Sequence, residues 1–308
     1  LPLYKNVFDI SFCAVQRVHN NHLNSVFNLF GNIYVNTVEA FAGINASGKT
    51  MALKVVSFTS ILLSATPLSA EFVPQILGDG INTIFDIDFY VDGKIYHLTS
   101  EIIKEKNQDE NPKIRIISER LWVKPVTTKI NKSNLWDYDK NTPVRVRGNS
   151  DEYLPEDVSI MIAVNKQIQN KTMFVDLAVL TNFNFLLPDA VSIPTEIISL
   201  LDPTIEYISI ENVNDKVITK LKFYRQKEHI LFNPAELNVY LSSGTVKGVR
   251  VFSDATRVLK KGGYMIVDEI ENHFNRELVA SLLRLFLYKK TNPNGAVLIF
   301  STHYPELL

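Results

Sequence analysis

The chain has 308 residues, of which 46% are apolar and 21% charged, and its formal net charge is −1. This composition is typical of a folded protein with one or two domains, and the near-zero charge excludes a global basic field for nucleic acid but not a local basic face. The single cysteine, Cys13, excludes a disulfide within the chain and suits a reducing cytosol.

The sequence predicts strands and one helix before residue 104. Residues 1–43 have the pattern of strands and turns, and residues 48–65 have that of a helix. Two alternating, β-rich runs flank Asp92 and Gly93, a dipeptide typical of tight turns, so a β-hairpin is predicted over residues 81–103.

The middle of the chain is less regular. Residues 104–150 are rich in lysine, asparagine and aspartate and are predicted to form loops with short strands. Residues 155–201 mix helical patterns with prolines that interrupt them. Two further strands are predicted within residues 204–212 and 215–226.

From residue 242 the pattern becomes helix, strand, helix, strand. Apolar residues three and four positions apart over residues 246–259 predict an amphipathic helix, and a second one is predicted over residues 278–286. Residues 264–267 and 296–300 are continuous apolar runs, as expected of strands that are covered on both faces. This order predicts an α/β layer.

The sequence predicts neither a membrane-spanning segment nor a signal peptide. The longest apolar run, residues 55–65, is too short and too rich in serine and threonine to cross a bilayer. The N-terminus shows no basic region followed by an apolar segment and a small-residue cleavage site, so we expect no signal peptide. The expected location is the cytoplasm, with no membrane partner.

The segment GINASGKT fits the phosphate-loop pattern G-x-x-x-x-G-K-[ST], with an extended run before it and a helix after it. Its glycines let backbone N–H groups approach phosphate oxygens, Lys49 can reach the β- and γ-phosphates, and the Thr50 hydroxyl can ligate Mg²⁺. The alternative is a chance glycine turn with a solvated lysine. The candidate nucleotide-binding residues in this loop are Gly43, Asn45, Ala46, Ser47, Gly48, Lys49 and Thr50.

Polar residues follow both predicted C-terminal strands, at the edge where α/β sheets bind ligands. Asp268 can hold Mg²⁺, Glu269 can orient and deprotonate an attacking water, and His303 can donate a hydrogen bond to a γ-phosphate. The alternatives are that the carboxylates only end a strand in solvent and that the histidine is structural. The remaining histidines have no convincing metal-ligand spacing: His19, His22, His97, His229 and His273.

Together with the segment LSSGT, these motifs resemble a known family. The order and spacing of GINASGKT, LSSGT, VDEIEN and IFSTHYPELL resemble an ABC-type ATPase of the RecF/SMC/OLD-like group, most closely the bacterial "AAA family ATPase" proteins of anti-phage defence loci. The resemblance implies an α/β P-loop NTPase fold with an ABC-ATPase-like head. Such a head has an N-terminal β-rich lobe, a RecA-like mixed sheet flanked by helices, and here an inserted α+β or helical middle region. The implied division is residues 1–103 and 202–308 for the ATPase core and 104–201 for the insertion.

The resemblance also implies a role for LSSGT. In the family, this signature caps the γ-phosphate of ATP that is held by a partner subunit, and Ser242, Ser243 and Gly244 suit that task because a helix N-terminus attracts anions. Without the family, Ser242 is a plain helix N-cap. The implied assembly is a dimer or larger homo-oligomer that sandwiches ATP and Mg²⁺, with Glu269, His303 and Lys49 as catalytic residues.

Some positions depart from the family pattern. Asn275 stands where the family often has His or Asp, and Gln75 is a weak candidate for the Q-loop glutamine. The signature lacks the Gly-Gly-Gln ending of membrane transporters. Members of the group continue past the switch histidine into a variable C-terminal region, and no nuclease residues are predicted within residues 1–308.

Three functions fit these motifs. The leading one is a Mg-ATP-driven switch that controls an effector protein, a toxin or a nuclease, in anti-phage defence by abortive infection. The second is a nucleotide-gated scaffold that sequesters such an effector with little hydrolysis. The third is a DNA-repair ATPase, against which the absence of a long coiled coil argues, and nucleic acid is a possible but not an indicated partner.

Overall fold

The chain forms two compact units in a computed structural model that describes residues 7–16, 18, 25–68, 76–105, 113–138, 142–148, 154–168, 172–178, 191–192, 194–214, 216–272, 274–304 and 306. Unit 1 comprises residues 1–15, 28–35 and 50–171, and unit 2 comprises residues 16–27, 36–49 and 172–308. Residues 104–201, expected to be one insertion, are thus shared between the units. The functional division into core and insertion stays a prediction.

Unit 1 is built on an antiparallel sheet with the strand order β4-β5-β6-β7. β4 (Thr83–Val91) and β5 (Lys94–Glu105) confirm the predicted hairpin. The turn residues Asp92 and Gly93 have φ values of 48° and 75°, the positive values that a two-residue turn of this kind requires.

The third strand of this sheet corrects the prediction of loops with short strands for residues 104–150. β6 (Lys113–Pro125) is 13 residues long and pairs with β5 along most of that strand, and β7 (Arg145–Val146) is short. The buried carboxylate of Glu119 and a register shift opposite Glu101 and Ile102 interrupt the alternation by which a strand is recognised.

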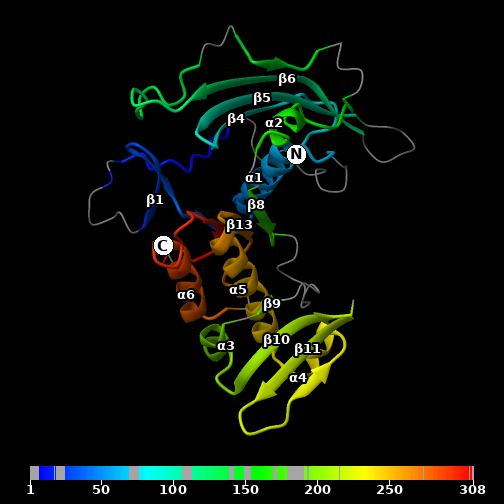
Figure 1. Ribbon diagram of the computed structural model, residues 1–308. Coiled ribbons are helices and arrows are strands. Elements are labelled where there is room, and N and C mark those ends of the chain that lie inside the picture. The colour runs from blue at the N-terminus through cyan, green and yellow to red at the C-terminus, as the bar shows by residue number, and fades with distance from the viewer. Residues whose placement is uncertain are drawn as a thin grey trace. The chain divides into compact units, whose positions relative to one another are not determined.

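Helix α1 (Lys49–Ser64) confirms the helix predicted after the phosphate loop. From Thr50 onward it belongs to unit 1, where Phe58 and Leu62 enter the core over the antiparallel sheet. The short helix α2 (Ile162–Asn165) adds Val164 to the same core. Figure 1 shows both helices beside β4, β5 and β6.

Unit 2 contains a parallel sheet with the order β3-β14-β13-β8. Its strands are β3 (Val38–Ala42), β14 (Val297–Thr302), β13 (Gly263–Val267) and β8 (Met173–Asp176). The two C-terminal strands confirm the predicted apolar runs, and every residue of β14 is buried. β8 was expected to lie in a helical region, and at four residues it is too short to show a period in the sequence.

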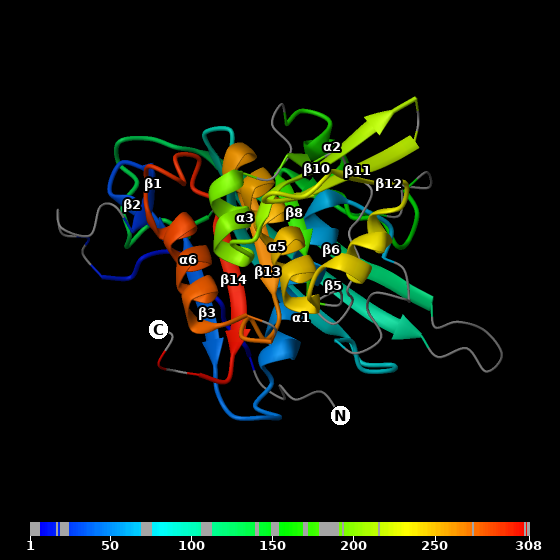
Figure 2. The ribbon, with the colours of Figure 1, turned by 90° about the horizontal axis from the view of Figure 1, so that it is seen from below.

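Two helices cover one face of the parallel sheet (Figure 2). They are α5 (Ser243–Lys261) and α6 (Arg276–Leu287), and both confirm predicted amphipathic helices. Their apolar side chains, with those of β13 and β14, form the main core of unit 2.

A second, antiparallel sheet in unit 2 has the order β12-β11-β10-β9. The predicted strand pair is confirmed as β10 (Ile205–Val213) and β11 (Lys216–Phe223). The described residues also form β1 (Val26–Phe30), β2 (Ile33–Asn36), β9 (Val191–Ser192), β12 (His229–Leu231), α3 (Thr195–Leu201), α4 (Leu237–Tyr240) and a short 3-10 helix (Pro234–Glu236).

Helix α5 belongs to two cores at once. Val246 and Val249, in its first half, pack with the antiparallel sheet of unit 2, and Phe252 and Leu259 pack with the parallel sheet. The helix is therefore held from both sides. Among the helices in the described ranges, none is long and apolar enough to cross a membrane.

Substitution of the glycine at the start of β13 tests how closely β13 pairs with β8. Gly263 has a φ of 124°, and a Cβ there would lie 2.1 Å from the carbonyl oxygen of Met173 on β8. We expect Gly263→Ala to lower the free energy of unfolding by about 2 kcal/mol or more, because overpacking costs about 1–3 kcal/mol and the backbone strain adds to it.

Gly31→Ala is the matched control for that substitution. Gly31 also has a positive φ, 50°, but no atom lies within 4 Å of the position that an alanine Cβ would take, so only strain of about 1–2 kcal/mol is expected. Urea unfolding followed by circular dichroism measures both losses. Equal losses in the two variants would contradict the close contact between β13 and β8.

Candidate functional site

The loop between β3 and α1 is tightly curled. Ala46 and Gly48 have positive φ values of 62° and 93°, and a Cβ on Gly43 would lie 2.8 Å from the hydroxyl oxygen of Ser47. The Gly43 N–H donates to the carbonyl oxygen of Thr302 at 3.3 Å, which ties the loop to the end of β14. Changes of φ sign along such a loop bring successive N–H groups to one side, as in an anion-binding nest.

The lysine of the loop points back into it. Lys49 is only 9% exposed, and its Nζ donates to the carbonyl oxygens of Gly43 at 2.8 Å and Ile44 at 3.0 Å. Its third contact is His303 Nδ1 at 3.2 Å. An ammonium group has three donors and no acceptor, so these contacts use all of them. The alternative of a solvated lysine does not match this geometry.

His303 connects Lys49 to Glu269. Its Nε2 lies 3.2 Å from Glu269 Oε1, on the opposite side of the ring from Lys49. Because Lys49 can only donate, Nδ1 is the accepting nitrogen, and the ring proton on Nε2 is donated to the carboxylate. The structure therefore brings together three predicted site residues in one hydrogen-bonded chain.

The strand order explains this chain. β14 lies between β3 and β13 in the parallel sheet. The phosphate loop follows β3, His303 follows β14, and Asp268 and Glu269 follow β13, so all three groups emerge at the same carboxyl edge. The histidine is central because its strand is central.

Glu269 is held in one orientation. Asn272 Nδ2 donates to its Oε2, while His303 contacts its Oε1. Its φ is 47°, in the left-handed region that a non-glycine residue rarely adopts. Strain of this kind persists where the surroundings fix the residue, and it occurs often at functional sites. Sequence analysis did not single out Asn272.

Ser301 joins the two acidic residues to β14. It is fully buried, its Oγ donates to Asp268 Oδ1, and it accepts the Glu269 N–H at 2.7 Å. Glu271 makes a similar link, since its Oε1 accepts the His303 N–H at 2.6 Å. Sequence analysis missed both residues. The available signal was a hydroxyl residue that ends a continuous apolar run.

The two predicted Mg²⁺ ligands come from different secondary-structure elements. Asp268 stands at the end of β13, and Thr50 lies in the first turn of α1. A carboxylate and a hydroxyl are oxygen ligands of the kind that Mg²⁺ prefers. Their assignment as Mg²⁺ ligands stays a prediction.

The signature residues form the N-terminus of α5. The Ser242 hydroxyl accepts the Thr245 N–H at 3.1 Å and lies 2.8 Å from the Thr245 hydroxyl. Ser242 and Ser243 are exposed. Within the part of the chain that the structure describes, the hydrogen bonds of Ser242 stay inside the first turn of α5, so the signature is not part of the chain from Lys49 to Glu269.

Of the two positions that depart from the family pattern, the structure describes one. Asn275 is the N-cap of α6, where its side chain accepts the Leu278 N–H at 2.9 Å. Gln75, together with His19, His22 and His273, lies outside the described residues.

The chain matches a model of a known protein family. The family model described as "AAA domain, putative AbiEii toxin, Type IV TA system" matches residues 40–308. The match begins within β3 and includes the phosphate loop, the acidic pair after β13 and His303. No curated protein matches the chain.

Removal of the Ser301 hydroxyl tests the link between the strands. In Ser301→Ala, the Glu269 N–H and one Asp268 oxygen lose a partner, so we expect the free energy of unfolding to fall by about 1–3 kcal/mol. The control is Ser253→Ala on α5, where a buried hydroxyl only adds a second bond to the Val249 carbonyl. Urea unfolding of both variants is the measurement, and a Ser301→Ala loss no larger than the control loss contradicts the linking role.

Proposed function

The chain belongs to the P-loop AAA domain family whose description names the AbiEii toxin and a type IV toxin–antitoxin system, and from this premise we propose that it is a Mg²⁺-dependent ATPase switch. The family establishes an α/β P-loop NTPase fold that binds ATP. The observation that carries the proposal of hydrolysis is the chain from Lys49 through His303 to Glu269.

The phosphate loop suits the triphosphate of ATP. Its N–H groups and the start of α1 favour phosphate oxygens. Lys49 Nζ already lies against two loop carbonyls, and it can exchange these for β- and γ-phosphate oxygens without leaving the loop. Bound Mg²⁺ neutralises charge on the transferred phosphoryl group, and Thr50 and Asp268 are the residues that would hold it.

Glu269 is the residue that best fits the role of general base. Its two oxygens are oriented by His303 and Asn272, so the carboxylate is aimed before a water is positioned. Glu269 would accept the proton of the attacking water. The Nε2–H of His303, which donates to Glu269 in the structure, would donate to the γ-phosphate when ATP is bound. Because His303 contacts both Lys49 and Glu269, a change at the lysine when phosphate binds or leaves reaches the general base through one side chain.

The second part of the proposal is an ABC-ATPase-like head that shares ATP between two subunits. α5 leads into β13 through the single residue Gly262, so its N-terminus points toward the carboxyl edge of the sheet. Its 19 residues span about 28 Å, whereas the five of β13 span about 17 Å, so the signature extends past that edge.

The lateral position of α5 supports this arrangement. The helix packs on β13 and β8, whereas the phosphate loop follows β3, at the opposite side of the sheet. Three strand spacings separate β3 from β8, about 14 Å. A signature at this distance suits the nucleotide of a second copy of the chain, which favours a head-to-tail dimer or a larger homo-oligomer.

The third part of the proposal is the role of the switch. Hydrolysis would loosen the dimer and change its grip on an effector protein, a toxin or a nuclease, in abortive infection. The support is the family description, which names a toxin and a toxin–antitoxin system. A cytoplasmic location fits this role.

Two substitutions separate binding from hydrolysis. Glu269→Gln is expected to bind ATP but to lower kcat about 100-fold or more, because it removes the general base. Lys49→Ala is expected to weaken ATP binding as well. Glu277→Gln, an exposed carboxylate in the first turn of α6, is the matched control and should retain wild-type activity.

Phosphate release and binding of a fluorescent ATP analogue measure the two effects. Turnover by the wild type that does not exceed that of Glu269→Gln contradicts the ATPase proposal. Tight binding together with such low turnover would instead support the nucleotide-gated scaffold.

A further inference from the structure

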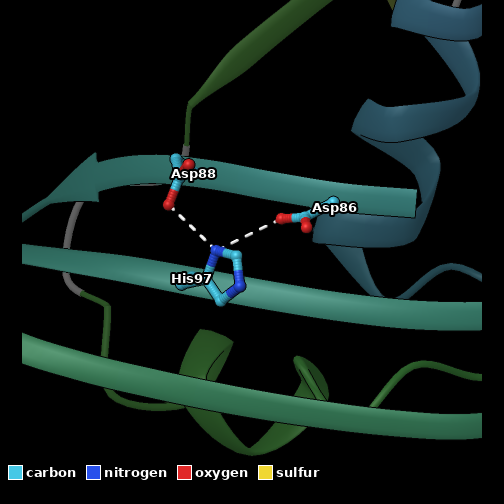
Figure 3. Close-up of side chains that lie close together, drawn as sticks. All are labelled: Asp86, Asp88 and His97. Atoms are coloured by element: carbon cyan, nitrogen blue, oxygen red, sulfur yellow. Dashed lines mark hydrogen bonds and ion pairs between the residues drawn. The ribbon is translucent and has the colours of Figure 1, made fainter. Parts of the chain in front are cut away.

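Unit 1 contains a cluster of metal-ligand side chains on its antiparallel sheet (Figure 3). Asp86 and Asp88 lie on β4 and His97 on β5. His97 Nδ1 is 3.0 Å from Asp88 Oδ1 and 3.3 Å from Asp86 Oδ1. The three ligand atoms all lie within 4.8 Å of one another.

The strand register places these side chains together. Asp88 and His97 are direct partners across the hairpin. Asp86, two residues earlier on β4, has its side chain on the same face of the sheet. The sequence hides the cluster, because neither a two-residue step on a strand nor a partner across a turn resembles the spacing of a helical or loop metal motif.

Two carboxylates converge on one ring nitrogen. A single Nδ1–H points along one line, so it can form a good hydrogen bond with one carboxylate only. The closer Asp88 contact is a hydrogen bond at 3.0 Å, and the Asp86 contact at 3.3 Å is an ion pair. A cation between the three atoms would satisfy both carboxylates and the imidazole lone pair.

The second ring nitrogen has a partner of the kind found behind metal-bound histidines. His97 Nε2 lies 3.4 Å from the Thr99 hydroxyl. When Nδ1 gives up its proton to bind a cation, a hydrogen bond from Nε2–H to this oxygen would hold the remaining ring proton. Such outer partners fix the tautomer and ring orientation of metal ligands.

Aromatic rings hold the imidazole in place, and one of them also contacts Asp88. His97 packs against Trp122 and Tyr138, each with ring centroids 5.2 Å away. The Tyr138 hydroxyl lies beside Asp88 and forms a hydrogen bond with its carboxylate. Burial, and then the nearby Asp88 carboxylate, raise the pKa of the Tyr138 phenol.

We propose that Asp86, Asp88 and His97 bind a divalent transition metal of the Zn²⁺ class through Oδ1, Oδ1 and Nδ1. Mixed carboxylate and imidazole donors suit such ions, whereas Mg²⁺ prefers oxygen ligands, so the site differs in preference from the one that serves ATP. The Asp86 side chain is 65% exposed, which gives the ion a path from solvent. A bound ion would add a link between β4 and β5, which already pair as a hairpin.

Calorimetric titration of the full chain with ZnCl₂, without nucleotide, tests this proposal. We expect saturable binding of one Zn²⁺ per chain. Asp86→Asn should weaken it about 100-fold, because loss of an outer partner alone costs about 10–100-fold and Asp86 is a direct ligand. His97→Gln should do the same. Since Asp86 is largely exposed, Asp86→Asn keeps the test valid if the packed His97 variant does not fold.

Two controls exclude other sites. Glu156→Gln removes a carboxylate of unit 1 that lies far from the cluster. The Glu156 backbone is hydrogen-bonded to Ile116, and Ile116 lies six residues, or about 20 Å, along β6 from Trp122. Glu269→Gln removes a carboxylate of the proposed ATP site. Both should bind Zn²⁺ as tightly as the wild type does. Unchanged binding in Asp86→Asn, loss of binding in Glu269→Gln, or no binding by the wild type overturns the proposal, and the last result identifies the cluster as an ion pair of a protonated histidine.

Discussion

The hydrogen-bonded chain from Lys49 through His303 to Glu269 depends on the parallel pairing of β14 between β3 and β13. It requires the ends of three strands to meet in a fixed lateral order, with the histidine strand in the middle. The buried strand β14 supplies this order, and Ser301 and Glu271 join it to the acidic turn after β13. A parallel sheet is well suited to the task, because all its carboxyl ends face one edge.

Helix α5 gives the same edge a connection to the rest of unit 2. Its first half packs with the antiparallel sheet and its second half with the parallel sheet, so movement of its N-terminus is resisted by two cores. Gly248 allows a close approach to α3, since a Cβ there would lie 2.2 Å from the Leu201 side chain. The N-terminus of α5, which begins after Ser242, is therefore fixed relative to both sheets of unit 2.

Local sequence patterns predicted the elements with strong periods or obligatory residues. The phosphate loop, the Asp92-Gly93 hairpin, α5, α6 and the two buried C-terminal strands all follow from spacing that one segment carries by itself. β6 could not be predicted in this way, because a register shift and the buried Glu119 mask the alternation. β8 has too few residues to show any period.

Prediction of the site residues from the sequence has the same limit. Lys49, Glu269 and His303 belong to short motifs, but Ser301, Glu271 and Asn272 gain their roles only from the neighbouring strand or turn that tertiary structure supplies. The cluster of Asp86, Asp88 and His97 also depends on register, since its members face one another only after β4 and β5 pair. Contacts between segments are what a single sequence does not show.

We propose that one chain holds ATP and a second chain completes the site, and mixing two inactive variants tests whether the site is shared. Lys49→Ala disables the phosphate loop, and Ser243→Arg disables the exposed signature by placing a cation at the start of α5. In an equimolar mixture, each mixed dimer contains one site with both wild-type halves. ATPase activity should therefore recover to about a quarter of the wild-type value, given random exchange of subunits. Activity that stays at the level of the separate variants would contradict a shared site.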